Sequence, residues 1–364
     1  MSRLYLIMEN GMIFEGESFG AEGEVTGEVV FTTGMTGYLE TLTDKSYYGQ
    51  IVLQTFPLIG NYGIIPEDFE SLNVGPLAYI VKTPCQDPSN FRSEGTLGTF
   101  LREKGIVGLY GIDTRALTKI IREHGVMNGR IASTLPDKSV LDEIKSYRIK
   151  NAVKSVSCSK ASFHKADEFR KARHTVALLD FGLKENIKRE LLRRGCDVWV
   201  LPYDTNPAVM SALNVDGIVL SNGPGDPAEN TDIIENLRAL LKKGIPIFGI
   251  CLGHQLLALA NGFKTCKLTY GHRGANQPVK DLFSGRVFIS SQNHGYAVTN
   301  ESIDPHIAGL WFVNVNDGTC EGLWYKHVPA FSIQFHPEAC GGPRDTAFLF
   351  DMFIDSMGGK MHAA

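Results

Sequence analysis

The sequence lacks the long apolar run that a membrane-spanning helix requires. No stretch of about 18 apolar residues occurs, and the apolar run within residues 2–16 is too short for a secretory signal. A block of like charge is also missing, and the formal net charge is −4, so the basic patch needed for nucleic-acid binding is absent. We therefore expect a cytoplasmic protein with no membrane or nucleic-acid partner.

Motifs for nucleotides and disulfides are missing as well. Neither the G-x-x-x-x-G-K-[ST] phosphate loop nor the G-x-G-x-x-G fingerprint occurs in the chain. The cysteines number seven and are widely scattered, which argues against a disulfide framework and favours a reducing compartment. We expect this chain to carry no cofactor and no metal of its own.

Length and composition indicate two globular domains. The chain has 364 residues, 43% of them hydrophobic and 21% charged. In residues 1–150, strand-like runs followed by helical ones predict an α+β domain. Residues 151–173 are rich in Lys and Ser and are predicted to be a linker. In residues 174–360, alternating strands and helices predict an α/β domain with an open, mostly parallel sheet and ligands at the carboxyl ends of its strands.

Two local patterns stand out in the amino-terminal half. Residues 2–16 form a predicted hairpin around Asn10-Gly11, a strong turn signal. The run DTRALTKIIREHG predicts a helix that begins after Asp113 and stops at Gly125.

The candidate nucleophile is Cys251, in the run IPIFGICLGHQLLALANG. The residues before it predict a buried strand and those after it a helix, so Cys251 falls at a sharp turn. Gly249 and Gly253 flank it in a G-x-C-x-G pattern, the thiol version of a nucleophile elbow. A helix N-terminus stabilises a thiolate, and the backbone N–H of Leu252 is placed to bind an oxyanion. The alternative is an inert buried cysteine, which residue type alone would favour.

A base and an orienting acid are found in FHPE. His336 ends a predicted strand, and Glu338 lies two residues on, so both side chains point to the same side of an extended chain. Pro337 stiffens the pair. Cys251, His336 and Glu338 then form a candidate catalytic triad of nucleophile, base and orienter. The tripeptide alone is a weak signal, and its value comes from the elbow.

Two other interpretations concern the same region. Cys251 with His254, and His336 with Cys340, have spacings that resemble a zinc site, and a zinc-stabilised binding module is one rival hypothesis. The turn SNGPGDP is either a simple strand-to-helix turn or a second source of oxyanion N–H groups at Gly223 or Gly225.

Three motifs together resemble one known family. LSNGPGDP, FGICLGHQ and FHPE occur in the order found in triad-type, class I glutamine amidotransferases, and this resemblance covers about residues 174–360. The amino-terminal half, with GEVVFTTGMTGYLETLTDKSYYGQIVLQTFPLIGNYG, GIDTRALTKIIREHG and NGRIA, looks like the small subunit of glutamine-dependent carbamoyl phosphate synthetase.

The resemblance implies a chemistry and a substrate site. Cys251 would attack the side-chain amide of L-glutamine, and water would hydrolyse the resulting thioester. The positions that match glutamine-holding residues of the family are Ser46, Gly223, Gly225, Leu252, Gln255, Asn293, Gly295 and Tyr296. Gly223 and Leu252 would donate to the oxyanion. Because Ser46 lies in the amino-terminal domain, both domains are expected to meet at the active site.

The resemblance also implies a partner. A large synthetase subunit would use ATP, Mg and bicarbonate, receive ammonia through an internal passage, and make carbamoyl phosphate for pyrimidine and arginine synthesis. The amino-terminal domain would serve docking to that subunit. The rival within the same class is the glutaminase component of anthranilate or GMP synthesis, which the additional amino-terminal domain argues against.

Overall fold

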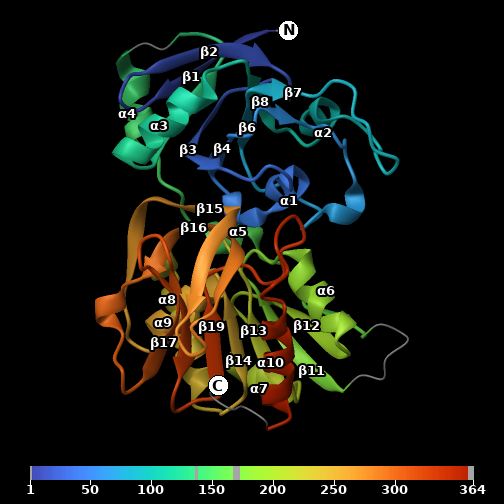
Figure 1. The fold of residues 1–364 in the computed structure, drawn as a ribbon, viewed down its shortest axis with the longest axis vertical. Coiled ribbons are helices and arrows are strands. Elements are labelled where there is room, and N and C mark those ends of the chain that lie inside the picture. Colours follow the sequence, from blue (N-terminus) through green and yellow to red (C-terminus); the bar gives the residue numbers. More distant parts are fainter. Residues whose placement is uncertain (1, 136–137, 167–172, 360–364) are drawn as a thin grey trace. The chain divides into compact units, whose positions relative to one another are not determined.

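The computed structural model describes residues 2–135, 138–166 and 173–359, which divide into two compact units, residues 1–150 and 151–364 (Figure 1). Each unit has hydrophobic clusters of its own. Within the described ranges, no helix combines the length and the apolar character needed to cross a membrane.

The first unit is built on a closed barrel of seven strands, in the order β1-β2-β8-β6-β4-β3-β9. These strands are β1 (Arg3–Met8), β2 (Ile13–Ser18), β3 (Val25–Thr32), β4 (Gln50–Gln54), β6 (Ala78–Val81), β8 (Val107–Tyr110) and β9 (Met127–Ala132). The run from β3 through β4 and β6 to β8 is parallel, and the other pairings are antiparallel. The prediction of strands and helices was correct, but it did not anticipate closure into a barrel.

Local signals account for parts of this unit. β1 and β2 form the predicted hairpin, with Ile7 opposite Ile13, and Gly11 supplies the positive φ of 87° that the tight turn requires. Asp113 caps helix α3 (Thr114–His124) by accepting a 2.9 Å hydrogen bond from the Ala116 N–H. Both features were predicted from the sequence.

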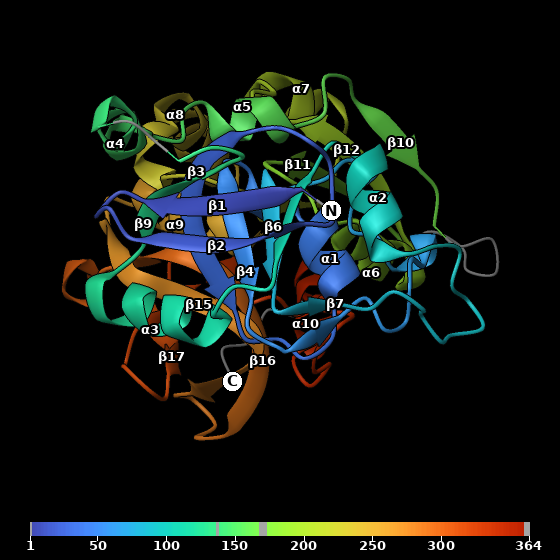
Figure 2. The same ribbon diagram turned by 90° about the horizontal axis from the view of Figure 1, so that it is seen from above.

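Side chains alternate along each barrel strand, so successive residues point into the barrel and away from it, and the inward-pointing ones are apolar. In β4, Ile51 and Leu53 join the cluster that draws on the barrel strands, whereas Val52 faces a second cluster outside. Helices α1 (Tyr38–Thr43) and α2 (Leu97–Glu103) contribute to the outer cluster, and Figure 2 shows α2 and α3 on different sides of the barrel strands. The remaining elements are η1 (Lys45–Tyr47), β5 (Leu58–Ile59), η2 (Pro66–Asp68), β7 (Thr83–Pro84) and α4 (Lys138–Ser146).

The second unit contains a ten-stranded sheet in the order β10-β12-β11-β13-β14-β19-β18-β17-β15-β16. Its strands are β10 (Ser162–His164), β11 (His174–Asp180), β12 (Cys196–Pro202), β13 (Gly217–Leu220), β14 (Ile247–Ile250), β15 (Thr265–Asp281), β16 (Val287–Val298), β17 (Ala308–Asn314), β18 (Cys320–Tyr325) and β19 (Ala330–Ile333). Its helices are α5 (Ala152–Val156), α6 (Glu185–Arg193), α7 (Pro207–Ala212), α8 (Thr231–Leu241), α9 (Leu252–Ala260) and α10 (Phe348–Met357), with short turns η3 (Pro227–Glu229) and η4 (Asn300–Ser302).

The sheet is less parallel than predicted. Only the run β12-β11-β13-β14-β19 is parallel, which makes four pairings, and the other five are antiparallel. The physical reason is the connections, because residues 282–286 and 315–319 join their strands by short turns. A parallel pair needs a longer crossover, usually a helix, and none lies between these strands.

The segment predicted as a linker contributes to the second unit instead. Its residues form α5 and β10, and β10 pairs antiparallel with β12. The Phe163 ring packs 4.8 Å from that of Trp199. Backbone pairing, the aromatic contact, the buried Val153 and a 2.8 Å hydrogen bond from the Cys158 N–H to Asp180 Oδ2 hold the segment, although it has few apolar residues. Residues 167–172 of this prediction lie outside the described part of the chain.

Helices cover both faces of the parallel strands. In β11, Ala177 and Leu179 pack in the cluster that includes α7, α8 and α9, and Val176 and Leu178 pack in the cluster that includes α6 and α10. This alternation buries the sheet on both sides, as parallel sheets require. The carboxyl ends of the parallel strands β11, β13, β14 and β19 therefore share one edge of the sheet (Figure 1). Cys251 and His336 follow β14 and β19 at this edge.

Candidate functional site

Cys251 lies between β14 and α9, in a backbone conformation that L-residues rarely adopt. Its φ is 54° and its ψ is −103°, and its side chain is buried. The Cys251 N–H donates a 2.9 Å hydrogen bond to the carbonyl of Ile333 at the end of β19. The turn holds the thiol at the N-terminus of α9, beside the neighbouring strand.

The glycines flanking Cys251 are sterically required. A Cβ on Gly253 would lie 2.3 Å from the Leu220 carbonyl oxygen, and a Cβ on Gly249 would lie 2.8 Å from the Gly253 carbonyl oxygen. The Gly253 N–H also donates to the Ser221 carbonyl at 3.0 Å. Gly253 is therefore small because the turn passes close to β13, and Gly249 is small because the first turn of α9 folds back against it.

His336 and Glu338 form a buried pair just after β19. Nδ1 of His336 lies 2.6 Å from Oε1 of Glu338, so this nitrogen carries the proton that is donated. The His336 backbone N–H is fixed by the Ser291 carbonyl at 2.9 Å. Nε2 makes no hydrogen bond to any atom of the described residues. Glu338 thus fixes Nδ1, and Nε2 is available for proton transfer.

Burial and charge act in opposite directions on this pair. Burial and the Lys184 ammonium lower the pKa of His336. The carboxylate of Glu338 and the nearby Cys251 sulfur raise this pKa by a larger amount, so the net shift is upward. Burial raises the pKa of Glu338, whereas His336 and Lys184 lower it, and the net shift is downward. Each group therefore favours the charged form of the other, an imidazolium beside a carboxylate.

Several residues predicted to hold substrate lie next to the thiol. Sγ of Cys251 donates a weak hydrogen bond of 3.7 Å to the Asn293 carbonyl. Leu252 adjoins Gly223, where an added Cβ would approach Cδ2 of Leu252 to 2.7 Å. Nε2 of Gln255 donates to the Tyr296 carbonyl at 2.7 Å.

The other predicted residues are placed less directly. Gly225 has a φ of 89°, and a Cβ there would meet Ala152 at 2.8 Å. Gly295 follows Asn293 on β16. Ser46 lies in η1 of the first unit, where its N–H donates to Asp44 Oδ1 at 2.9 Å. Its contact with a substrate in the second unit stays a prediction.

Sequence reasoning missed Lys184. Its electrostatic effect reaches both His336 and Glu338, and its backbone N–H donates to Oδ1 of Asn222 at 3.0 Å. The available signal was its position after β11, at the same sheet edge as the other site residues.

The zinc-like spacings do not correspond to a joint site. Nδ1 of His254 lies 2.8 Å from the Ser332 hydroxyl, and its Nε2 faces Cys320 Sγ at 4.0 Å. Burial lowers the pKa of His254 to about 3, so its ring is neutral. Cys340 is exposed and accepts a contact from Arg344. His254 is thus a buried core histidine.

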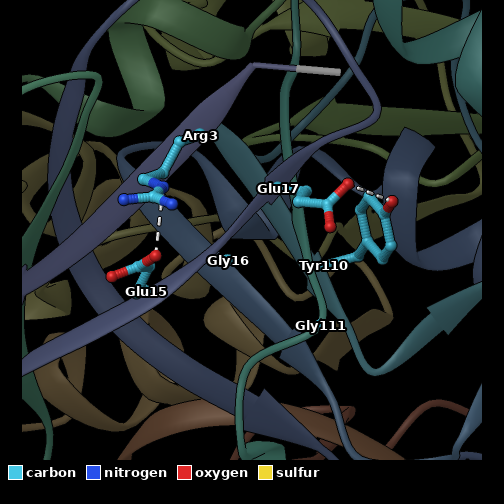
Figure 3. A pocket seen from close by; sticks show the side chains of 6 residues that line it. All are labelled: Arg3, Glu15, Gly16, Glu17, Tyr110 and Gly111. Carbon is cyan, nitrogen blue, oxygen red and sulfur yellow. Dashed lines mark hydrogen bonds and ion pairs between the residues drawn. The ribbon is translucent and has the colours of Figure 1, made fainter.

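A separate cavity of about 540 Å³ lies on the first unit (Figure 3). Its lining residues are Arg3, Glu15, Gly16, Glu17, Tyr110 and Gly111. Arg3 pairs with Glu15 at 3.0 Å, and both side chains are more than half exposed, at 67% and 55%. Exposed pairs of this kind contribute little energy, and no predicted site residue lines this cavity.

Comparisons with known proteins give consistent matches along the chain. Residues 6–131 match the family described as carbamoyl-phosphate synthase small chain, CPSase domain, and residues 177–356 match glutamine amidotransferase class-I. The carbamoyl phosphate synthase small chain of Listeria monocytogenes serotype 4b is 48% identical over 362 residues, covering 99% of this chain and 98% of the relative. That of Clostridium perfringens is 50% identical over 352 residues, covering 96% and 98%.

Proposed function

The chain belongs to the carbamoyl phosphate synthase small chain family, and we propose that it hydrolyses glutamine at Cys251 in its second unit. The family's glutamine amidotransferase domain makes this chain the glutaminase subunit. The assignment to Cys251 is carried by the pairing of β14 with β19. This pairing sets Cys251, whose backbone has a positive φ, beside His336, whose ring is held by Glu338.

The proposed reaction begins when the Cys251 thiol passes its proton to Nε2 of His336, and the resulting thiolate attacks the side-chain amide carbon of glutamine. The C–N bond breaks, the imidazolium of His336 donates a proton to the departing nitrogen, and ammonia leaves a γ-glutamyl thioester. His336, now neutral, takes a proton from water, whose oxygen attacks the thioester; the C–S bond breaks, glutamate leaves, and His336 returns the proton to the Cys251 thiolate. Glu338 keeps the proton on Nδ1 and orients the ring throughout.

The strand–turn–helix at Cys251 acts in this proposal as a nucleophile elbow. Leu252 is the first residue of α9, so its N–H has no partner within the helix and can bind the oxyanion. Gly223 is the second proposed donor, because its backbone passes within contact distance of Leu252. The other proposed glutamine-holding residues are Ser46, Gly225, Gln255, Asn293, Gly295 and Tyr296.

The proposal includes a large synthetase subunit. That subunit would supply the ATP, Mg and bicarbonate chemistry and receive the ammonia, while this chain itself needs no cofactor. The first unit would dock to it, and the second unit, which begins at residue 151, would carry the glutaminase site. A cytoplasmic location is part of the proposal and is supported by seven free cysteines. Co-purification with a chorismate- or nucleotide-dependent partner would contradict it.

Covalent labelling tests the nucleophile. The full chain is treated with a glutamine analogue that carries an electrophilic carbon near the amide position, and cysteine-containing peptides are analysed by mass spectrometry. We expect one adduct, on Cys251, and none on Cys266 or Cys340, although these two are exposed. Their exposure makes them internal controls for unspecific alkylation. Labelling of the exposed cysteines with Cys251 unmodified would overturn the assignment.

Reconstitution with the large subunit tests the division of labour. The Cys251→Ser variant should lose glutamine-dependent synthesis of carbamoyl phosphate and keep synthesis from added ammonia. Cys266→Ser, at an exposed position on β15, is the matched control and should keep both activities. If Cys251→Ser retains glutamine-dependent synthesis, the thiol is not the nucleophile.

A further inference from the structure

A buried polar cluster on the antiparallel half of the sheet takes no part in the proposed glutaminase reaction. His272 on β15 faces its cross-strand partner His294 on β16, with ring centroids 4.9 Å apart. Glu321 on β18 completes the group, and one ligand atom from each of the three residues lies within 4.8 Å of the others. All three side chains are largely or fully buried.

In each histidine ring, the nitrogen that points away from the group already has a hydrogen-bond partner. Nε2 of His272 lies 2.8 Å from Oδ2 of Asp317, and Nδ1 of His294 lies 2.8 Å from the Tyr296 carbonyl. Both acceptors are oxygens, so in the neutral rings these nitrogens carry the protons. Asp317 is itself held by Thr319, through its N–H at 3.0 Å and its hydroxyl at 2.6 Å. A carboxylate or carbonyl behind each histidine is the arrangement that orients metal-binding imidazoles.

In the neutral rings, Nδ1 of His272 and Nε2 of His294 therefore carry lone pairs, and both face side-chain oxygens. Nδ1 of His272 lies 3.4 Å from Glu321 Oε1, and Nε2 of His294 lies 3.9 Å from the same oxygen. Nε2 of His294 also faces Gln292 Oε1 at 3.1 Å. The Gln292 amide is oriented by its Nε2, which donates to the Ser290 hydroxyl at 3.2 Å. Two acceptors facing each other repel unless a proton or a metal cation lies between them.

These separations suit a tetrahedral ion. Ligands about 2.0–2.1 Å from zinc at tetrahedral angles lie about 3.3 Å from one another. The three distances given above, 3.1, 3.4 and 3.9 Å, bracket that value. Nδ2 of Asn314 lies 3.3 Å from Glu321 Oε1 and 3.4 Å from Nδ1 of His272, so its N–H groups face both of these ligand atoms. Binding of an ion therefore requires the Asn314 amide to turn aside.

The carboxylate supplies an independent argument. Glu321 has 0% exposure, and its Oε2 makes no hydrogen bond within the residues that the structure describes. A buried carboxylate without full pairing is costly, so it needs a positive charge nearby. A divalent ion bound at Oε1 would balance the charge of the carboxylate as a whole.

We propose that His272, His294, Glu321 and the amide oxygen of Gln292 bind one divalent transition-metal ion, of which zinc fits the ligand set best. Two imidazoles with oxygen donors suit zinc better than calcium or magnesium, which prefer oxygen alone. Four protein ligands close the shell, so the ion has a structural role. It ties β15, β16 and β18 together next to the Asn293–Tyr296 segment of β16.

Cobalt titration of the full chain tests the site. The chain is stripped with a chelator, dialysed and titrated with Co²⁺. We expect one ion per chain with the intense visible absorption of a tetrahedral site, without thiolate-to-cobalt charge transfer, and displacement by one equivalent of Zn²⁺. Absence of this absorption, or a spectrum with thiolate charge transfer, overturns the proposal. The readout does not depend on the glutaminase reaction, so either proposal can fail alone.

Variants assign the ligands. Glu321→Gln should abolish the cobalt absorption, and Asp317→Asn should weaken binding about 10–100-fold because it removes the hydrogen bond behind His272. Asp317 has a side chain that is 44% exposed, so its amide variant is expected to fold even if Glu321→Gln does not. His327→Gln, at an exposed position of the same unit, is the control and should leave binding unchanged. Unchanged binding in Asp317→Asn and in Glu321→Gln would refute the assignment.

Discussion

Glycine normally lowers the free energy of unfolding relative to alanine at a buried position. At position 251 we expect this difference between the glycine and alanine variants to be much smaller or reversed. The conformation at Cys251, φ 54° and ψ −103°, is the mirror image of an extended one, which glycine adopts freely and residues with a Cβ do not. Such strain amounts to about 1–3 kcal/mol.

Ala258 supplies the reference. It lies in α9 with 0% exposure, and Ala258→Gly should cost about 2 kcal/mol, from about 1 for helix propensity and about 0.8 for the buried methyl group. Cys251 precedes α9, so the helix-propensity cost does not apply there, and about 0.8 kcal/mol for the buried methyl group is set against about 1–3 kcal/mol of relieved strain. We therefore expect Cys251→Gly to be at least as stable against unfolding as Cys251→Ala.

Tryptophan fluorescence during urea unfolding is the appropriate assay. The three tryptophans, Trp199, Trp311 and Trp324, all lie in the second unit, so the signal reports that unit alone. Midpoints and slopes are compared for the variants at positions 251 and 258, with the slopes checked for two-state behaviour. If glycine costs the same about 2 kcal/mol against alanine at both positions, Cys251 stores no backbone strain and the reasoning is refuted.

Three other predictions concern steric packing at Gly253, the charged pair of His336 and Glu338, and the hydrogen bonds at the start of α1. Gly253→Ala should destabilise the second unit by about 1–3 kcal/mol, since its Cβ would lie 2.3 Å from the Leu220 carbonyl oxygen; an unchanged urea midpoint would contradict this. His336 has a raised pKa in the folded state, so its stabilisation by Glu338 is present in full below the unfolded pKa and is lost as pH rises through the raised value. The difference in unfolding free energy between the wild type and Glu338→Gln should therefore shrink at alkaline pH, and a constant difference would argue against the pair. Tyr62→Phe removes the hydroxyl that accepts two backbone N–H groups at the start of α1, at 2.9 and 3.2 Å; these amides should exchange faster with deuterium, and unchanged protection would show that the bonds are dispensable.

Local signals in the sequence predicted the local structure well. The strand before Cys251 and the helix after it, the hairpin around Asn10-Gly11 and the cap at Asp113 all depend on neighbouring residues. The pairing of His336 with Glu338 was predicted from their spacing in an extended chain, but Pro337 and Glu338 lie in a turn after β19, and this turn brings the two side chains together. These features need no knowledge of distant contacts.

Long-range pairing could not be predicted in the same way. Closure of the first unit into a barrel depends on β1 pairing with both β2 and β9, and the hydrophobic pattern of a strand does not name its partners. The cluster of His272, His294 and Glu321 was missed because its members lie on three strands and have no short metal-binding spacing. The sequence analysis accordingly expected no metal site.

The neighbouring positions of β14 and β19 have a consequence for synthesis and folding. Among the described strands, β19 comes last in the chain, whereas Cys251 follows β14 and leaves the ribosome much earlier. Contacts of such large sequence separation form late, because the intervening chain must first be ordered. A nascent or partly folded chain therefore carries Cys251 without His336 beside it. The thiol meets its proposed base only when the parallel half of the sheet is complete, which couples reactivity to finished folding.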